Sequence, residues 1–378
     1  MKKNRNIAII EYLFIILLFI NLFLGGLNRM FYLGSGVALI VLSLLMLVLV
    51  KYNKENRRIF IPILIWTILN LFYMLRDFTG ISTYIGFQHI GILLYFWVIT
   101  CLLSKEENKK IFVNFLKIIH ILLLIVTCYL VLIKKQSNAS IESYIYIGFG
   151  TFFAFIITND KMKIKVFMLS VLWMILAYFV GARSLSIAFL LMYFVIFFIT
   201  KVNVKEKVLN FIFIAYYVLL NLFPMLYTWL ATSKYRYTLD MLAIKYTESR
   251  FFSGRDILWN LVYGQLTDFS KIVFGTGFDN IGQLVRGNMS FHNLYVTLIA
   301  EGGLLLIISF GLILFSIWKK LSAKNDFKAR VIMGFIIAVL YKQSFDISLV
   351  ENNLNIAFMV WTSIAVGLIS NEKEVKEE

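Results

Sequence analysis

The sequence predicts an all-α, polytopic integral membrane protein with about twelve transmembrane helices. Three observations predict this fold class. Of the 378 residues, 60% are hydrophobic and only 15% are charged, whereas a soluble domain carries about 25% charged residues. The apolar residues form uncharged blocks, such as 12–24 and 37–50. Short basic clusters separate the blocks, so the net charge of +16 indicates cytoplasmic loops and not nucleic-acid binding.

The apolar blocks have the length that a bilayer requires. About 20 residues rising ~1.5 Å each cross a hydrocarbon core of ~30 Å. Lipid offers the backbone no hydrogen-bond partner, so each block is expected to be helical. Because the blocks recur along nearly the whole chain, we expect one transmembrane domain over 1–378. The expected spans are 7–27, 31–50, 59–75, 84–103, 111–133, 141–158, 164–181, 184–200, 208–230, 293–318, 331–345 and 353–370.

The basic residues alternate between the loops on the two sides. Loops on one side, together with both chain ends, hold 23 Lys and Arg residues, and the short loops on the other side hold 6. Positive charge concentrates in cytoplasmic loops. The alternation therefore predicts that both termini are cytoplasmic.

One loop is too long to be a simple connection. Residues 231–292 lie between the ninth and tenth spans, which places them outside the cytoplasm. Apolar residues recur at helical spacing in two stretches, and this predicts short amphipathic helices. The stretches are Leu239, Leu242 and Tyr246, followed by Ile257, Leu261 and Leu266.

The sequence gives no sign of a metal site or a cofactor. Cys101 and Cys128, the two cysteines, lie in apolar runs, so disulfides and cysteine metal sites are not expected. The lone Gly275-Thr276-Gly277 lacks the strand and third glycine of a nucleotide fingerprint. It is expected to form a tight turn, the alternative being an amide nest for an anion.

Among the three histidines, His292 is the candidate for catalysis. It lies where the long loop enters the tenth span, and a histidine there can exchange a proton near neutral pH. His120 lies in an apolar helix and His89 at an outer helix end, and we expect both to be packing histidines.

Among the arginines expected on the outer side, the candidates for substrate contact are Arg183, Arg250 and Arg255. The guanidinium group can grip phosphate through its planar fork, which lysine cannot copy. The alternative is that they are interfacial anchors that snorkel to water. Glu301 lies nine residues after His292, about 13 Å along a helix, and a carboxylate at that depth needs a partner or a role.

These residues together resemble the O-antigen ligase and polymerase superfamily, which includes the Wzy-type polysaccharide polymerases. The resemblance covers 165–310 by motif and the whole chain by its number of helices and its long outer loop. The motifs are Gly181 to Ser186, Ser253-Gly254-Arg255 with Trp259, Phe274-Gly275-Thr276-Gly277-Phe278, His292-Asn293 and Glu301-Gly302-Gly303-Leu304-Leu305.

The resemblance implies a metal-independent glycosyltransferase, without a cofactor, in the plasma (inner) membrane and with its active site outside the cytoplasm. Donor and acceptor would be oligosaccharides on undecaprenyl diphosphate, and a chain-length regulator is a possible partner. The implied catalytic residues are His292, Arg255 and Arg183. The implied substrate-binding residues are Arg250, Asn293 and Glu301.

Three other functions stay open. A ligase would transfer the glycan to a different acceptor, but Leu306 departs from the ligase pattern, which favours the polymerase. A flippase or other transporter should show repeat symmetry and broken midplane helices, and the sequence shows neither. A purely structural membrane protein would leave the outer arginines without a role.

Overall fold

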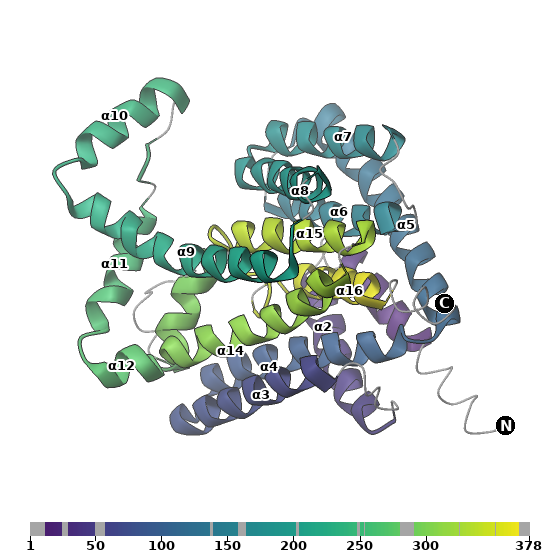
Figure 1. Ribbon diagram of the computed structural model, residues 1–378, viewed down its shortest axis with the longest axis horizontal. Helices are drawn as coiled ribbons and strands as arrows, with labels where there is room; N and C mark the ends of the chain where they lie inside the picture. The colour runs from purple at the N-terminus through teal and green to yellow at the C-terminus, as the bar shows by residue number, and fades with distance from the viewer. Residues whose placement is uncertain are drawn as a thin grey trace.

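The computed structural model describes residues 12–24, 29–49, 57–136, 139–157, 164–201, 204–247, 250–252, 254–279, 291–324, 326–351 and 353–369. Every regular element among them is a helix, and this part of the chain contains no strand (Figure 1). The prediction of an all-α fold is confirmed for these residues.

The helices begin and end close to the expected spans. The described N-terminal segment 12–24 is helical and ends in η1 (Ile20–Leu24). The helices on the other spans are α2 (Arg29–Leu49), α3 (Arg57–Asp77), α4 (Gly80–Leu102), α5 (Glu106–Cys128) continued by η3 (Tyr129–Ile133), α6 (Ala139–Ile157), α7 (Ile164–Val180), α8 (Arg183–Lys201), α9 (Glu206–Thr232), α14 (Leu294–Lys324), α15 (Phe327–Gln343) and α16 (Leu354–Ile369).

Five helical segments are long and apolar enough to cross a membrane. They are Arg58–Asp77, Gly80–Leu102, Glu106–Ile133, Glu206–Thr232 and Leu294–Lys324. The described parts of other apolar helices are shorter, such as Phe167–Val180 and Leu354–Ile369. The structure is therefore compatible with a membrane protein, and the count of about twelve spans stays a prediction.

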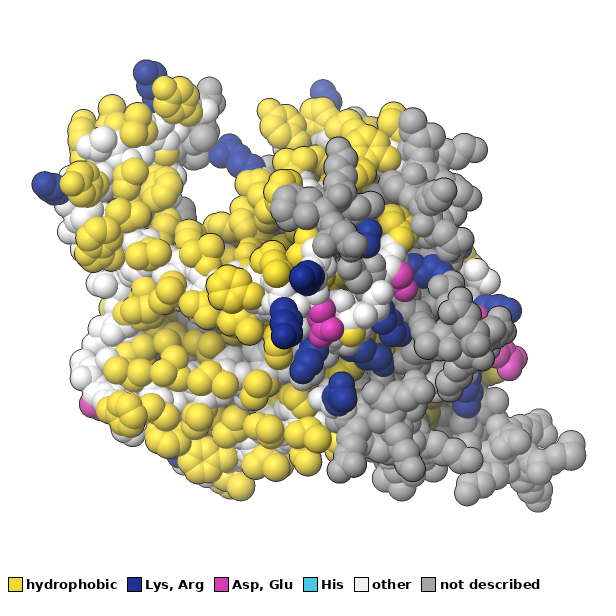
Figure 2. Space-filling model, in the orientation of Figure 1, with side chains coloured by type: hydrophobic (Ala, Val, Ile, Leu, Met, Phe, Trp, Pro, Cys, Tyr) yellow, Lys and Arg dark blue, Asp and Glu magenta, His cyan; other side chains and the backbone are white. Residues whose placement is uncertain are grey.

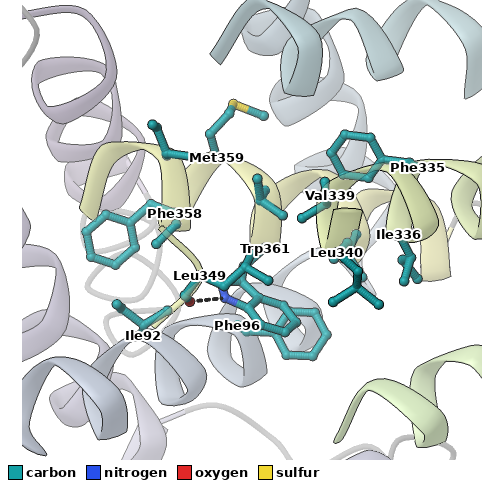
Figure 3. Close-up of a cluster of buried hydrophobic side chains, with 14 of the residues drawn as sticks. Ile92, Phe96, Phe335, Ile336, Val339, Leu340, Leu349, Phe358, Met359 and Trp361 are labelled. Carbon is teal, nitrogen blue, oxygen red and sulfur yellow. Dashed lines mark hydrogen bonds between the residues drawn. The ribbon is translucent and has the colours of Figure 1, made fainter. Parts of the chain in front are cut away.

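The centre of the bundle is built on α16. Every side chain of this helix is buried, and it packs against α4, α6 and α15. Figure 3 shows Phe358 and Trp361 of α16 beside Ile92 and Phe96 of α4. The indole N–H of Trp361 donates to the carbonyl oxygen of Leu349 at 2.8 Å, which satisfies a donor that would otherwise be buried without a partner.

The outer helices expose apolar side chains. On α9, Phe211 is 70% exposed. In Figure 2, hydrophobic side chains cover much of the surface formed by α9, α14 and their neighbours, and Lys and Arg side chains gather toward the ends of these helices that lie away from α11 and α12. A broad apolar surface on the outside of a helix bundle is what lipid contact requires.

The long segment after α9 contains three described helices, α10 (Arg236–Thr247), α11 (Arg255–Gln265) and α12 (Phe269–Phe274). They cover the two stretches of helical spacing, except that Leu266 is the residue after α11. Four of the six apolar residues of that spacing are exposed, Leu242, Tyr246, Ile257 and Leu261, and Leu239 and Leu266 are half-buried. The buried face of α11 carries Asp256, Trp259 and Val262 instead.

The orientation in the membrane can be tested by thiol labelling. With Cys101 and Cys128 replaced by serine, a cysteine at position 245 on α10 is expected to react with a membrane-impermeant reagent on intact, wall-permeable cells. A cysteine at position 320 on α14 should react only after lysis, because the basic loop after α14 is predicted to be cytoplasmic. Labelling in the opposite order would contradict an extracytoplasmic site.

Candidate functional site

A cavity of about 580 Å³ lies at one end of the helix bundle. Its acidic, basic and histidine lining residues come from five different parts of the chain: Glu142, Arg183, Arg255, His292, Lys342 and Asp346. The structure therefore brings together the three residues predicted to be catalytic, His292, Arg255 and Arg183.

Chain connectivity explains why these residues meet. Glu142 lies in the first turn of α6, Arg183 begins α8, His292 precedes α14, and Lys342 is near the end of α15. The starts of α6 and α8 are separated by two helices, and two consecutive helices of an antiparallel bundle return the chain to the same end. The end of α15 is two helices beyond the start of α14, so it reaches that end as well.

Trp259 sets the position of His292 relative to Arg255. Arg255 begins α11, and Trp259 lies one turn later on the same helix. The buried indole of Trp259 donates a hydrogen bond to the carbonyl oxygen of Phe291 at 2.8 Å. Because residues four apart share a helix face, this bond holds the residue before His292 next to the face that carries Arg255. Gly254, which precedes Arg255, has φ of +84°, a conformation that glycine adopts without cost.

His292 has an unusual backbone conformation. Its φ is +50°, in the left-handed region that few residues other than glycine occupy. Such conformations cost about 1–3 kcal/mol and persist where neighbouring contacts impose them. The flanking residues supply those contacts, since Phe291 is held by Trp259 and Asn293 is buried.

Asn293 is a helix cap and not a cavity residue. Its side-chain oxygen accepts hydrogen bonds from the backbone N–H groups of Tyr295 and Val296, at 2.9 and 3.0 Å. Its side-chain nitrogen donates to the carbonyl oxygen of Ser344 at 2.9 Å. Asn293 thus fixes the start of α14 and ties it to the end of α15. Asn293 lies outside the lining of the cavity, and its role in substrate binding stays a prediction.

Charge is unevenly balanced in the cavity. Nζ of Lys342 lies 2.9 Å from Oε1 of Glu142 and 3.7 Å from Oδ2 of Asp346. Lys342 is buried although it is charged, and two carboxylates offset the cost of that burial. Arg183 and Arg255 add two more cations. Three cations therefore face two carboxylates, which favours an anionic ligand.

The same surroundings favour the uncharged form of His292. Desolvation by the surrounding protein, and then the positive charge of Arg255, lower the pKa of His292 below its usual value of 6.5. Asp346 acts in the opposite direction and raises this pKa. A histidine that is neutral at pH 7 can accept a proton, so the cavity combines an anion site with a general base.

Two of the other predicted residues lie away from the cavity lining. Arg250 is exposed in the short connection before α11. Glu301 is buried in α14, where its Oε2 lies 3.6 Å from Nε2 of His89. Neither lines the cavity.

The Gly275-Thr276-Gly277 turn packs against a break in α14. Gly303 has φ of 63° and ψ of −154° inside that helix, so nearby carbonyl groups lose their helical partners. The N–H groups of Thr276 and Gly277 donate to the carbonyl oxygens of Ala300 and Glu301, at 2.7 and 3.1 Å. A Cβ atom on Gly275 would lie 2.5 Å from the nitrogen of Gly302. This explains both glycine motifs by close backbone packing, and it leaves these two N–H groups engaged with protein and not with an anion.

Of the other two histidines, His120 has the surroundings of a packing residue. Its Nδ1 lies 3.0 Å from Oγ1 of Thr151, and its Nε2 accepts a hydrogen bond from the indole of Trp173 at 3.1 Å. His89 differs, because its Nε2 faces Glu301 and Glu351.

Sequence reasoning did not assign Glu142, Lys342 or Asp346 to the site. One signal was present for Lys342, which ends an otherwise apolar span, since a charge there usually has a partner or a function. Ser253 of the arginine motif lies outside the described residues. No family model, curated protein or solved structure matches the chain.

Proposed function

We propose that this protein is a membrane glycosyltransferase that polymerises oligosaccharide repeat units carried on undecaprenyl diphosphate, on the outer face of the plasma membrane. The product would be a capsular, O-antigen or exopolysaccharide. The observation that carries the proposal is the cavity in which Arg183, Arg255 and Lys342 lie with His292.

The cations fit the charge that the reaction develops. When the bond between the sugar and the diphosphate breaks, negative charge builds up on the leaving group. Fixed guanidinium groups stabilise that charge more in the transition state than in the ground state, which accelerates the reaction. Arg255 begins α11 and lies 5.8 Å from the ring centroid of Phe345, so its position is defined from two sides.

His292 fits the role of general base. In the proposed step, the acceptor hydroxyl oxygen attacks the anomeric carbon of the donor, and the bond from that carbon to the diphosphate oxygen breaks. The hydroxyl proton passes to the neutral imidazole, and undecaprenyl diphosphate leaves as an anion. The lowered pKa of His292 supports this role because the base must be uncharged to accept the proton.

The surroundings of the cavity suit a lipid-linked substrate. Helix α11, which contributes Arg255 to the cavity, and α10, which precedes it in the chain, expose Tyr237, Tyr246, Ile257 and Leu261. Tyrosine and apolar side chains collect where a membrane meets water. A substrate whose diphosphate lies at that interface would reach the arginines without leaving the bilayer.

A reconstituted assay tests the proposed function. Purified protein in liposomes, given only undecaprenyl-diphosphate repeat units, should make a ladder of longer lipid-linked glycans without any nucleotide sugar. A product that appears only when a separate lipid or protein acceptor is added would instead establish a ligase. Movement of the repeat unit across the bilayer without transfer would contradict both and indicate a flippase.

The pH dependence of the rate is expected to follow His292. Protonation removes the base, so the rate should fall as the pH drops through the folded-state pKa, which lies below 6.5. Arg255 lowers this pKa and Asp346 raises it. The acid limb of the pH–rate profile should therefore move to higher pH in Arg255→Gln and to lower pH in Asp346→Asn. These shifts are expected even if the maximal rate of either variant changes. Initial rates between pH 4.5 and 8 measure the shifts, and unchanged limbs in both variants would exclude His292 as the titrating group.

A further inference from the structure

A second cluster of titratable groups lies inside the bundle, separate from the cavity. It consists of His89 on α4, Glu301 on α14 and Glu351 in the connection between α15 and α16. None of the three lines the cavity. Their side chains are buried, with exposed fractions of 0%, 1% and 7%. Burial of two carboxylates in a helix bundle is expensive unless their charge is compensated.

Hydrogen bonds determine the tautomer of His89. The side-chain nitrogen of Asn70 donates to the carbonyl oxygen of Trp66 at 2.8 Å, so the side-chain oxygen of Asn70 faces Nδ1 of His89 at 2.9 Å. Because that oxygen can only accept, Nδ1 must carry the hydrogen. In the neutral ring, Nε2 then presents a lone pair.

The lone pair of Nε2 faces two oxygen atoms. Nε2 lies 3.6 Å from Oε2 of Glu301 and 3.7 Å from Oε2 of Glu351. Neither Nε2 of His89 nor Oε2 of Glu301 has a hydrogen-bond partner among the residues that the structure describes. In His120, by contrast, the indole of Trp173 fills the same position with an N–H donor. Three electron-rich atoms therefore point at one another around a shared space.

We propose that His89, Glu301 and Glu351 bind a divalent transition-metal ion of the Zn²⁺ type. One candidate ligand atom from each residue lies within 4.8 Å of the other two. Ligand atoms around a tetrahedral zinc ion are separated by about 3.3 Å, so the two measured distances need to contract by only a few tenths of an ångström. A divalent cation also neutralises the two carboxylates, which a single proton does not.

The surrounding shell has the form of a metal site. The carboxamide of Asn70 accepts from Nδ1 of His89, and such a bond to the second ring nitrogen orients a metal-binding histidine. The ring of Trp66 stacks on the imidazole with centroids 5.4 Å apart, and Phe278 packs edge-on at 5.5 Å. These aromatic rings fix the imidazole plane and exclude water from its faces.

The bound ion would cross-link three parts of the bundle next to the cavity. Glu351 follows Asp346 and precedes Asn353, and both of these line the cavity. Glu301 precedes the break of α14 at Gly303. An ion on His89 would therefore connect α4 to the helix break and to one wall of the cavity. The role is structural, so this inference does not depend on the proposed glycosyl transfer.

The metal content of the purified protein tests the proposal. Protein expressed with Zn²⁺ and purified in detergent should carry about one zinc per chain by elemental analysis, and X-ray absorption should show one nitrogen and two carboxylate ligands at ~2.0–2.2 Å. Glu301→Gln and Glu351→Gln should each lower the zinc content at least tenfold. Glu142→Gln, the same change at a carboxylate of the cavity, should retain it.

Measurements on the unmodified chain keep the test independent of how the variants fold. After chelation, addition of Zn²⁺ should raise the midpoint of thermal unfolding, since an ion that binds only the folded state stabilises it. Two results together would contradict the proposed metal site. The purified protein would hold less than about 0.1 equivalent of any divalent metal, and added Zn²⁺ would leave the midpoint of thermal unfolding unchanged. The cluster would then be held by protons shared among the three side chains.

Discussion

Replacing His292 with asparagine is expected to reduce glycan transfer by about 10²–10⁴-fold, the usual contribution of a general base. Asparagine tolerates the left-handed backbone conformation that His292 adopts with φ of +50°, so the fold should survive. Asparagine cannot accept a proton near neutral pH. Initial rates with purified lipid-linked repeat units, at equal amounts of folded protein, measure the effect.

A change at the rim of the same cavity provides the control. Ser184 lines the cavity without charge, so Ser184→Ala should retain a rate close to that of the parent. If His292→Asn also retained that rate, the base would have to be another group, and the proposed role of His292 would be wrong.

Replacing Arg255 with lysine is expected to reduce the rate by 10-fold or more. The charge is preserved, but the planar fork that can hold two phosphate oxygens is lost. One hydrogen bond to a charged group contributes about 1.5–3 kcal/mol, and each ~1.4 kcal/mol corresponds to a factor of ten in rate. Arg183→Lys should behave similarly, because Arg183 lines the same cavity. Rates at saturating donor separate lost transition-state stabilisation from weaker binding.

Arg250 offers a matched control for the arginine changes. It is exposed and lies outside the cavity lining, so Arg250→Lys should have little effect. Full activity in both Arg255→Lys and Arg183→Lys would contradict a role in binding the diphosphate and would favour the alternative that both arginines are interfacial anchors. A large loss in Arg250→Lys alone would place the diphosphate elsewhere in the long loop.

The helices could be predicted from the sequence because hydrophobicity alone fixes their lengths in lipid. The expected spans 84–103 and 353–370 correspond closely to α4 (Gly80–Leu102) and α16 (Leu354–Ile369). Helical spacing also indicated α10 and α11. It did not reveal which face of α11 would be buried, because the buried residues include Asp256, whose partner is Arg236 on α10 at 3.1 Å.

The cavity was predictable only in part. The alternation of charged loops predicts that Arg183, Arg255 and His292 lie on the same side of the membrane, and these three residues do share one cavity. Ion pairs and hydrogen bonds between residues far apart in the sequence produce no local sequence pattern that would predict them. Lys342 and Glu142 are 200 residues apart and form an ion pair. In the same way, nothing near Asn293 shows that its side chain would cap α14.

The depth of Glu301 in its helix was evident, but its surroundings were not. Its position nine residues after His292 correctly placed it away from the start of the helix. That His89 and Glu351 would meet it depends on how α4 and the connection after α15 pack against α14. No local pattern indicates that these three residues cluster, because they are scattered over more than 260 positions.

The most direct measurement of the central claim is the release of the lipid carrier. Each new glycosidic bond should release one molecule of undecaprenyl diphosphate, because the anomeric carbon of the donor changes partner from the diphosphate oxygen to the acceptor oxygen. Mass spectrometry of a reaction with purified protein should therefore find lipid diphosphate and glycan bonds in a ratio of one to one, with both reduced about 10²–10⁴-fold in His292→Asn. Longer glycans without released lipid diphosphate, or release that continues unchanged in His292→Asn, would contradict transfer by this cavity.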